Sequence, residues 1–291
     1  PQDPGTDWDF ADTRDHYLQR LYHQDPAALR AEDPSTYLAL SQAVTGEVAG
    51  ETFAQWRGAD SETHGALVFT LADLGPGFGW GITDASGQPK PIFHALARAW
   101  QPVTVVMTDE GVNGLRLQVI NETARTISTV LEVYGVRDGT VVVSRAEREL
   151  LLSPRSTIAI AATDLLGGFF DYNYAYRFGP AEHEVVVARL REAETVLSEA
   201  FSFPLGRAAA MSMHPLTADL RQDADGWLVE VSTDGFAPSV HVQAEGFVAD
   251  DGWFHLTAEH PRQVRLRPLA GLTEQRPHGF VASATGARTG F

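Results

Sequence analysis

The sequence predicts a multi-domain protein. Residues 1–101 are expected to form the incomplete C-terminal end of a TIM (β/α)8 barrel, followed by two immunoglobulin-like β-sandwiches over 102–206 and 212–291. Two observations predict this order. Before Pro102 a continuously apolar segment, an elaborate loop and a helix follow one another, as in one unit of a β/α barrel. After Pro102 the apolar residues alternate with polar ones, and short strands recur at intervals of about 10–12 residues, as in sandwiches.

Helices are expected first. Apolar side chains on one face predict a short helix over 13–22, with Asp12 as its N-cap. The pairs Asp25-Pro26 and Asp33-Pro34 each place a capping acid before a proline, which favours a helix start. The second pair opens a long helix over Pro34–Trp56, whose apolar residues recur at helical spacing.

The strand and loop come next. Two loops are expected, a turn-rich one over 1–11 before the helices and a polar one over 58–64 after them. The run Ala66–Leu71 that follows is apolar throughout, which is typical of a strand covered on both faces. Asp73 and a Gly/Pro-rich turn follow it. Pro91 then suits the first position of a closing helix.

These elements are too few for a whole barrel. A complete (β/α)8 barrel needs about 250 residues, whereas only about 100 precede Pro102. A single strand cannot satisfy the hydrogen-bonding groups on its own edges. We therefore expect the first six or seven barrel strands to be missing from this sequence. A processed start at Pro1 is the alternative.

Two sets of period-two segments predict the two sandwiches, joined by a linker over 207–211, with an aromatic-rich loop or edge over 167–176 in the first. The expected strands of the first sandwich are 103–107, 115–121, 128–134, 141–145, 149–152, 157–161, 184–190 and 195–203. Those of the second are 216–220, 227–232, 239–243, 252–256, 263–268 and 280–283.

Composition excludes several partners and chemistries. The chain has 291 residues, a formal net charge of −16 and no cysteine. Phosphate binding needs clustered Lys and Arg, so nucleic acid and anionic membranes are not expected partners. No apolar run reaches the roughly 18 residues of a membrane span. A soluble protein is expected, with the compartment open and the cytoplasm preferred.

Residues 65–102 resemble a known family. The segments LVFTLAD at Leu67–Asp73, Gly75-Pro76 with Trp80, DASGQPK at 84–90 and WQPV at 100–103 follow the end of the catalytic barrel in family 2 glycoside hydrolases, specifically the β-mannosidases. The segments 7–22 and 37–48 are similar to those that the family places after its seventh strand. The resemblance implies a retaining glycosidase acting on terminal β-mannosides, with two sandwiches after the barrel.

The catalytic pair of the family is absent. Retaining hydrolysis needs two carboxyl groups about 5–5.5 Å apart. The resemblance places both glutamates upstream of Pro1. Glu47 and Glu51 lie on an expected helix and Glu62 in a polar loop, and no glutamate lies at the end of a buried strand. No catalytic residue is therefore assigned, and the chain alone is predicted to be inactive.

Three residues are candidates for the substrate pocket: Asp73, Trp80 and Phe69. Asp73 follows the expected strand at the end where barrels hold their sites, and either binds sugar hydroxyls or holds the following loop. Trp80 either stacks on a sugar or packs against the closing helix, which is preferred. Phe69 stands where the family has tryptophan, and barrel core is its preferred interpretation. The departures Phe69, Ala72 and Gly75 put the sugar contacts of the family in doubt.

Other polar and aromatic residues are expected to be structural. Arg14 should form an ion pair with an acidic neighbour, and Asp12 and Asp15 should support the first helical turn. The aromatic run Phe169–Tyr176 either binds sugar or packs between domains, with packing preferred. The histidines lack metal-ligand spacing, so no metal and no cofactor are expected.

The preferred hypothesis is therefore the C-terminal part of a β-mannosidase-like enzyme, whose partners would be a β-mannoside and the missing N-terminal part of the same enzyme. One alternative is a non-catalytic carbohydrate-binding or interaction protein built from β-sandwiches. Another is a different family 2 activity, such as β-galactosidase or β-glucuronidase.

Overall fold

The computed structural model describes residues 8–59, 61–63, 65–77, 79–269 and 275–291. Most of the expected N-terminal loop and parts of the 58–64 loop lie outside these residues. The described chain is mainly β-sheet with few helices, and it divides into two compact units. Unit 1 comprises residues 1–49, 67–96 and 211–291, and unit 2 comprises 50–66 and 97–210.

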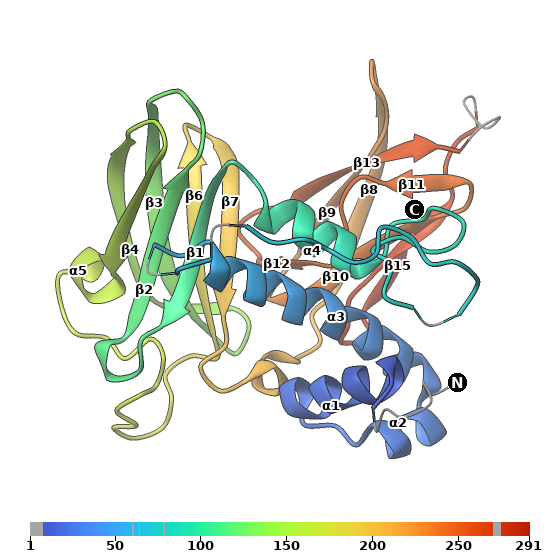
Figure 1. Ribbon diagram of the computed structural model, residues 1–291, viewed down its shortest axis with the longest axis horizontal. Coiled ribbons are helices and arrows are strands. Elements are labelled where there is room, and N and C mark those ends of the chain that lie inside the picture. The colour runs from blue at the N-terminus through green and yellow to red at the C-terminus, as the bar shows by residue number, and fades with distance from the viewer. Residues whose placement is uncertain (1–7, 60, 64, 78, 270–274) are drawn as a thin grey trace. The chain divides into compact units, whose positions relative to one another are not determined.

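Unit 2 is a sandwich of two antiparallel sheets (Figure 1). The first sheet has the order β1-β2-β5 and the second the order β4-β3-β6-β7. Their bounds are β1 Val103–Asp109, β2 Leu115–Asn121, β3 Ile127–Arg137, β4 Val141–Leu152, β5 Ser156–Ala161, β6 Val185–Glu192 and β7 Thr195–Ser202. The 3-10 turns η1 (Gly111–Asn113) and η2 (Arg207–Ala210) and the short helix α5 (Ala162–Leu166) complete it.

Alternating apolar residues explain why these strands form a sandwich. Val105, Leu117 and Val119 from one sheet and Leu131 and Leu190 from the other are buried in one hydrophobic core. Alternate residues of a strand point to opposite faces of the sheet, so each strand turns one apolar face inward. Unit 2 therefore holds two packed antiparallel sheets, and an immunoglobulin-like domain over 102–206 stays a prediction.

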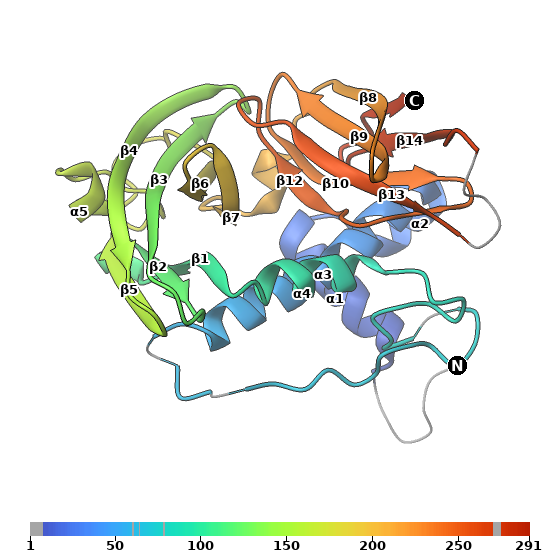
Figure 2. The same ribbon diagram turned by 90° about the horizontal axis from the view of Figure 1, so that it is seen from above.

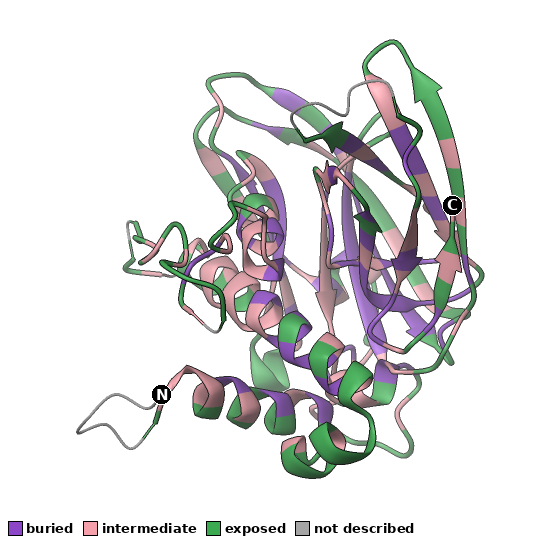
Figure 3. Ribbon diagram, turned by 90° about the vertical axis from the view of Figure 1, so that its right-hand side faces the viewer, coloured by how far each residue is buried: buried purple, intermediate pink, exposed green. Residues whose placement is uncertain are grey.

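Unit 1 contains a second pair of antiparallel four-stranded sheets, with orders β12-β10-β14-β15 and β11-β13-β9-β8. Their bounds are β8 Leu216–Asp223, β9 Gly226–Thr233, β10 Ala237–Ala244, β11 Phe247–Ala249, β12 Phe254–Leu256, β13 Arg262–Pro268, β14 Gly279–Ala282 and β15 Arg288–Gly290. Residues such as Val229, Val240, Phe254 and Val264 fill a shared core. Figure 3 shows their inner faces as purple, buried stretches.

The helices are α1 (Phe10–Tyr22), α2 (Pro26–Glu32), α3 (Pro34–Trp56) and α4 (Pro91–Ala99). Within unit 1, Leu18 of α1 packs against Leu40 and Val44 of α3. A Cβ on Gly46 would lie 3.2 Å from the carbonyl oxygen of Pro91, so this glycine allows α3 and α4 to approach closely. Among the described helices, none combines the length and apolarity needed to cross a bilayer.

The N-terminal cap of α1 differs from the prediction. Asp9, not Asp12, is the N-cap: its carboxylate accepts a 2.9 Å hydrogen bond from the amide of Asp12. Asp12 reaches back to the amide of Asp9 at 3.1 Å, which completes a capping box. The helix therefore begins three residues earlier than expected, because Asp9 and not Asp12 caps it.

The expected strand Ala66–Leu71 is wrong. The segment is an extended coil with Leu67, Phe69 and Leu71 exposed by 99%, 87% and 70%, and Figure 2 draws it as a coil leading toward α4. Its neighbourhood offers one short parallel bridge, between Ala72 and Thr83. A strand of a parallel sheet needs partners along both edges, and the described residues do not supply them, so a barrel end is not formed as a sheet.

Candidate functional site

The loop of residues 72–90 in unit 1 is held by Asp73. Its side chain is only 4% exposed, and its Oδ1 accepts a 2.8 Å hydrogen bond from the backbone amide of Gly81. Its other oxygen forms an ion pair with the ammonium group of Lys90. Lys90 also donates a 3.3 Å hydrogen bond to the carbonyl of Gly79. Asp73 thus ties both ends of the loop together.

Glycines make this arrangement possible. A Cβ on Gly79 would lie 2.3 Å from Asp73 Oδ1, and one on Gly81 would lie 2.4 Å from the Asp73 nitrogen. No side chain tolerates such distances, so the loop closes around Asp73 only because both positions are glycine. A second turn begins at Asp84, whose Oδ1 accepts hydrogen bonds from the amides of Ser86 and Gln88 and from the Ser86 hydroxyl. These bonds, led by that from the Ser86 side chain, lower the pKa of Asp84.

A cavity of about 1030 Å³ lies beside this loop in unit 1. Residues from α1, α3, the described part of the 77–90 loop, α4 and the segment from β10 to Trp253 line it, together with Leu269. Trp80 stands at this cavity with 58% of its surface exposed, and its ring meets Phe10 edge-on at 4.8 Å. Trp80 therefore packs against Phe10 of α1, and part of its indole ring remains exposed at the cavity.

Arg14 also lines the cavity and belongs to a polar cluster. It pairs with Asp15 at 3.0 Å, which agrees with the expected ion pair, and its guanidinium bonds to the hydroxyl of Tyr37. Arg30 donates to the same hydroxyl at 2.6 Å and to Asp15 at 2.5 Å. The hydrogen bond to Tyr37 is the leading cause that raises the pKa of Arg30. The cluster fixes α1 against α2 and α3.

The β-sheet side of the cavity carries an imidazole against an indole. The rings of His241 and Trp253 are 4.3 Å apart and nearly parallel, at 8°. Burial lowers the pKa of His241 to about 4, so the ring is neutral at pH 7. Asp251, also at the cavity, pairs with Arg262 at 2.5 Å. Nothing in the spacing of these residues connects them to Trp80, because more than 150 positions of chain separate them.

The structure brings Asp73 and Trp80 into one loop but separates Phe69 from the cavity. Phe69 is exposed and does not line this cavity. The preferred interpretation of Phe69 as core is therefore not met by the described residues, since no sheet covers it.

The glutamates before Pro102 have other contacts. Glu47 Oε1 lies 3.2 Å from His255 Nε2 and accepts a 3.1 Å hydrogen bond from Ser239. Glu51 pairs with Arg207 at 3.3 Å, and Glu62 is exposed. Hydrolysis with retention requires two facing carboxyl groups about 5–5.5 Å apart.

Known proteins were compared with the chain. No protein-family model matches it. β-Mannosidase B of Aspergillus terreus and of Aspergillus niger are each 35% identical to it over 101 residues. This stretch covers 33% of the chain and 12% of either relative.

The chain resembles the C-terminal portion of β-mannosidases. The solved β-D-mannosidase of Dictyoglomus thermophilum superposes with a TM-score of 0.69 at 16% identity, over 85% of this chain and 30% of that one. The exo-chitosanase of Amycolatopsis orientalis gives 0.67 at 11% identity, over 88% and 34%. At these identities the superpositions show a shared fold, so the β-mannosidase-like chain has the architecture of about one third of such an enzyme.

Proposed function

We propose that this chain is the C-terminal part of a β-mannosidase-like retaining glycoside hydrolase acting on terminal β-mannosides. Residues 1–101 would complete the catalytic barrel once upstream polypeptide is present, and the two sandwiches, of immunoglobulin-like type, would support it. The carboxyl pair would come from upstream, so the chain alone would not hydrolyse glycosides. The observation that carries this proposal is the exposed apolar segment directly before the Asp73 loop.

That segment has the properties of a strand without its sheet. Leu67, Phe69 and Leu71 alternate along an extended backbone and are exposed by 99%, 87% and 70%. Burying one such side chain contributes about 1.5–3 kcal/mol, so leaving three in water is costly. Parallel strands on both edges and helices over the faces would cover them, as in a barrel.

The loop after this segment would then stand at the mouth of the barrel. Its closure on Asp73 makes it rigid before any substrate arrives, and preorganised positions lower the free-energy cost of binding. Trp80 is the candidate for contact with the sugar, since its indole is more than half exposed. Asp73 supports it through the loop.

The test is complementation. The chain is expressed alone and together with an upstream polypeptide from a β-mannosidase-like enzyme, and release of p-nitrophenol from its β-mannoside is measured. We expect no turnover from the chain alone and turnover from the pair. Turnover by the chain alone, after a contaminant control, would overturn the proposal, as would a complemented enzyme that hydrolyses only β-galactosides or β-glucuronides.

Two variants sharpen the assay. Phe69→Asp should abolish complementation because a charge would enter the barrel wall, whereas Leu151→Asp, at an exposed leucine of β4, should leave it intact. Trp80→Ala should raise KM for the β-mannoside more than it lowers kcat. Equal activity of Phe69→Asp and the parent would contradict the role of the segment.

A further inference from the structure

Unit 2 carries an aromatic surface that the proposed function does not use. Phe169, Tyr176 and Phe178 come from the loop between α5 and β6 and are exposed by 64%, 41% and 81%. The rings of Phe169 and Tyr176 meet edge to face at 5.3 Å, and those of Tyr176 and Phe178 lie stacked at 5.6 Å. Exposed aromatic side chains gathered in this way commonly mark a binding surface.

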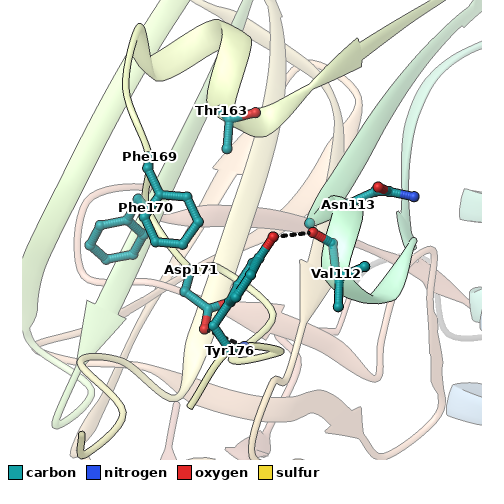
Figure 4. Close-up of a pocket in the computed structure, with 8 residues that line it drawn as sticks. Val112, Asn113, Thr163, Phe169, Phe170, Asp171 and Tyr176 are labelled. Carbon is teal, nitrogen blue, oxygen red and sulfur yellow. Dashed lines mark hydrogen bonds between the residues drawn. The ribbon is translucent and has the colours of Figure 1, made fainter. Parts of the chain in front are cut away.

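A pocket of about 290 Å³ opens beside these rings. Figure 4 shows Phe169 and Tyr176 next to each other, with Val112 across from Tyr176 and Thr163 near Phe169. Two polar residues, Thr163 and Asp171, are also among those that line the pocket. The volume lies just below the range of about 300–1,000 Å³ that is typical of pockets for drug-sized molecules, so a ligand as small as one sugar ring suits it.

The loop is rigid before any ligand binds. The two oxygens of Asp171 accept 2.9 Å hydrogen bonds from the amides of Ala175 and Tyr176. The Tyr176 hydroxyl donates to the carbonyl of Val112 at 2.8 Å, which joins the loop to η1. Asn173 is buried and donates to the carbonyl of Gly111 at 2.6 Å. Such bracing fixes the rings in place and reduces the entropy lost on binding.

We propose that this pocket binds one pyranose unit of a β-linked glycan. A pyranose has a face of C–H groups and a rim of hydroxyls, so the face would stack on Phe169 or Tyr176 while hydroxyls bond to Thr163 and Asp171. Phe178 would extend the surface to the next sugar. The flat rings and the small, partly polar pocket favour a sugar over a folded protein, whose interfaces are larger and continuous.

Affinity electrophoresis of the full chain tests this. Native gels are cast with soluble β-mannan, glucomannan or β-glucan. The choice of β-mannan rests on the proposed function, whereas the binding itself does not. We expect at least one glycan to retard the chain. Tyr176→Ala and Phe178→Ala should each weaken retardation about tenfold, the scale of one lost aromatic contact of about 1.4 kcal/mol.

Two controls separate the possible outcomes. Leu151→Ala removes a similarly exposed apolar side chain of unit 2 and should leave retardation unchanged. Melting curves verify that each variant is folded. Retardation by none of the glycans, or retardation equal in the aromatic variants, would overturn the proposal. So would self-association in sedimentation that the aromatic variants abolish, because the surface would then be a protein interface.

Discussion

The backbone amide of Gly81 lies 2.8 Å from Oδ1 of Asp73, across a loop closed on a buried carboxylate. Lys90 neutralises the same carboxylate from the other side. With a side chain only 4% exposed, Asp73 is committed to the loop. This geometry favours loop support over direct sugar binding among the two alternatives for this residue.

Gly81→Ala should open this loop. The new Cβ would lie 2.4 Å from the Asp73 nitrogen, and because that atom is backbone it cannot move aside. Overpacking of this kind costs about 1–3 kcal/mol. Urea unfolding measures the change in the free energy of unfolding. Gly75→Ala is the control, since nothing lies within 4 Å of its added Cβ, and an equal effect of both variants would contradict the close approach.

The second prediction concerns Glu47 on α3. Its carboxylate bonds to Ser239 and His255 within unit 1. Glu47→Ala removes both contacts and should destabilise the protein by about 1–3 kcal/mol, since buried partners are left unsatisfied. Glu47→Gln keeps an acceptor for Ser239 and should cost less. Thermal or urea unfolding compares the two.

The control for Glu47 lies one turn along the same helix. Glu51 is a largely exposed partner of Arg207, and an exposed ion pair contributes about 0–1 kcal/mol. Glu51→Ala should therefore change stability little. If Glu47→Ala were as mild as Glu51→Ala, the buried contacts of Glu47 would not stabilise unit 1.

Local signals in the sequence predicted much of the fold. Asp33 before Pro34 predicted α3, which the structure shows over Pro34–Trp56, and hydrogen bonds from Thr36 and Ser35 lower the pKa of Asp33 to about 2. The alternation of Leu115, Leu117 and Val119 gave β2 its observed bounds. Such signals act between near neighbours, so no knowledge of the rest of the chain is needed.

Predictions of strands were wrong where the strand depends on partners that are distant in the sequence. The apolar run Ala66–Leu71 resembles a buried strand, yet burial requires other strands, and the described residues do not provide them. Two strands were predicted over 141–145 and 149–152. The structure has one strand, β4 (Val141–Leu152), because the whole segment pairs with β3 apart from one bulge. Cross-strand pairing decides such cases, and a single sequence does not show it.

The candidate site was predicted only in part. Asp73 was singled out because it follows the apolar run Ala66–Leu71, and Trp80 because it lies in the loop after it; contact of either residue with a sugar stays a prediction. Trp253 and His241 lie in sandwich strands and turns far along the chain, and only folding brings them to the same cavity. The predicted ion pair of Arg14 with Asp15 was confirmed, because the two residues are adjacent in the sequence. Trp253 was missed because its contacts at the cavity arise only when distant parts of the chain fold together.

The third prediction concerns Arg189 in unit 2, whose side chain is fully buried. Its Nε lies 2.9 Å from Glu199 and its Nη1 lies 3.1 Å from Glu132, both on adjacent strands. Arg189→Met removes the fully buried cation between two carboxylates, although Arg145 remains 3.4 Å from Glu132. Breaking a buried ion pair on one side costs about 3–5 kcal/mol. The variant should be measured by urea unfolding at pH 7.

One further measurement checks the cause. Glu132→Gln added to Arg189→Met should recover part of the loss, because one buried charge is removed. A double variant as unstable as Arg189→Met alone would contradict this account.

The fourth prediction is a pH dependence that originates at His241. Burial is the main cause that lowers its pKa to about 4, against an ordinary value of 6.5, with a smaller contribution from Arg288. Between pH 6.5 and about 4, His241 is therefore mostly protonated in the unfolded chain and mostly neutral in the folded protein. Stability is complete above pH 6.5 and falls as the pH decreases toward 4, by up to about 3 kcal/mol.

His241→Phe separates this contribution from the others. Phenylalanine keeps an aromatic ring against Trp253 and cannot take up a proton, so its free energy of unfolding should fall less steeply between pH 6.5 and 4.5. Burial lowers the pKa of His183 in unit 2 as well, so some dependence of the same sign should persist in the variant. His278→Gln, at an exposed histidine, is the control and should follow the parent. Parallel curves for His241→Phe and the parent would show that the pKa of His241 does not change on folding, because only a group whose pKa changes on folding can link stability to pH.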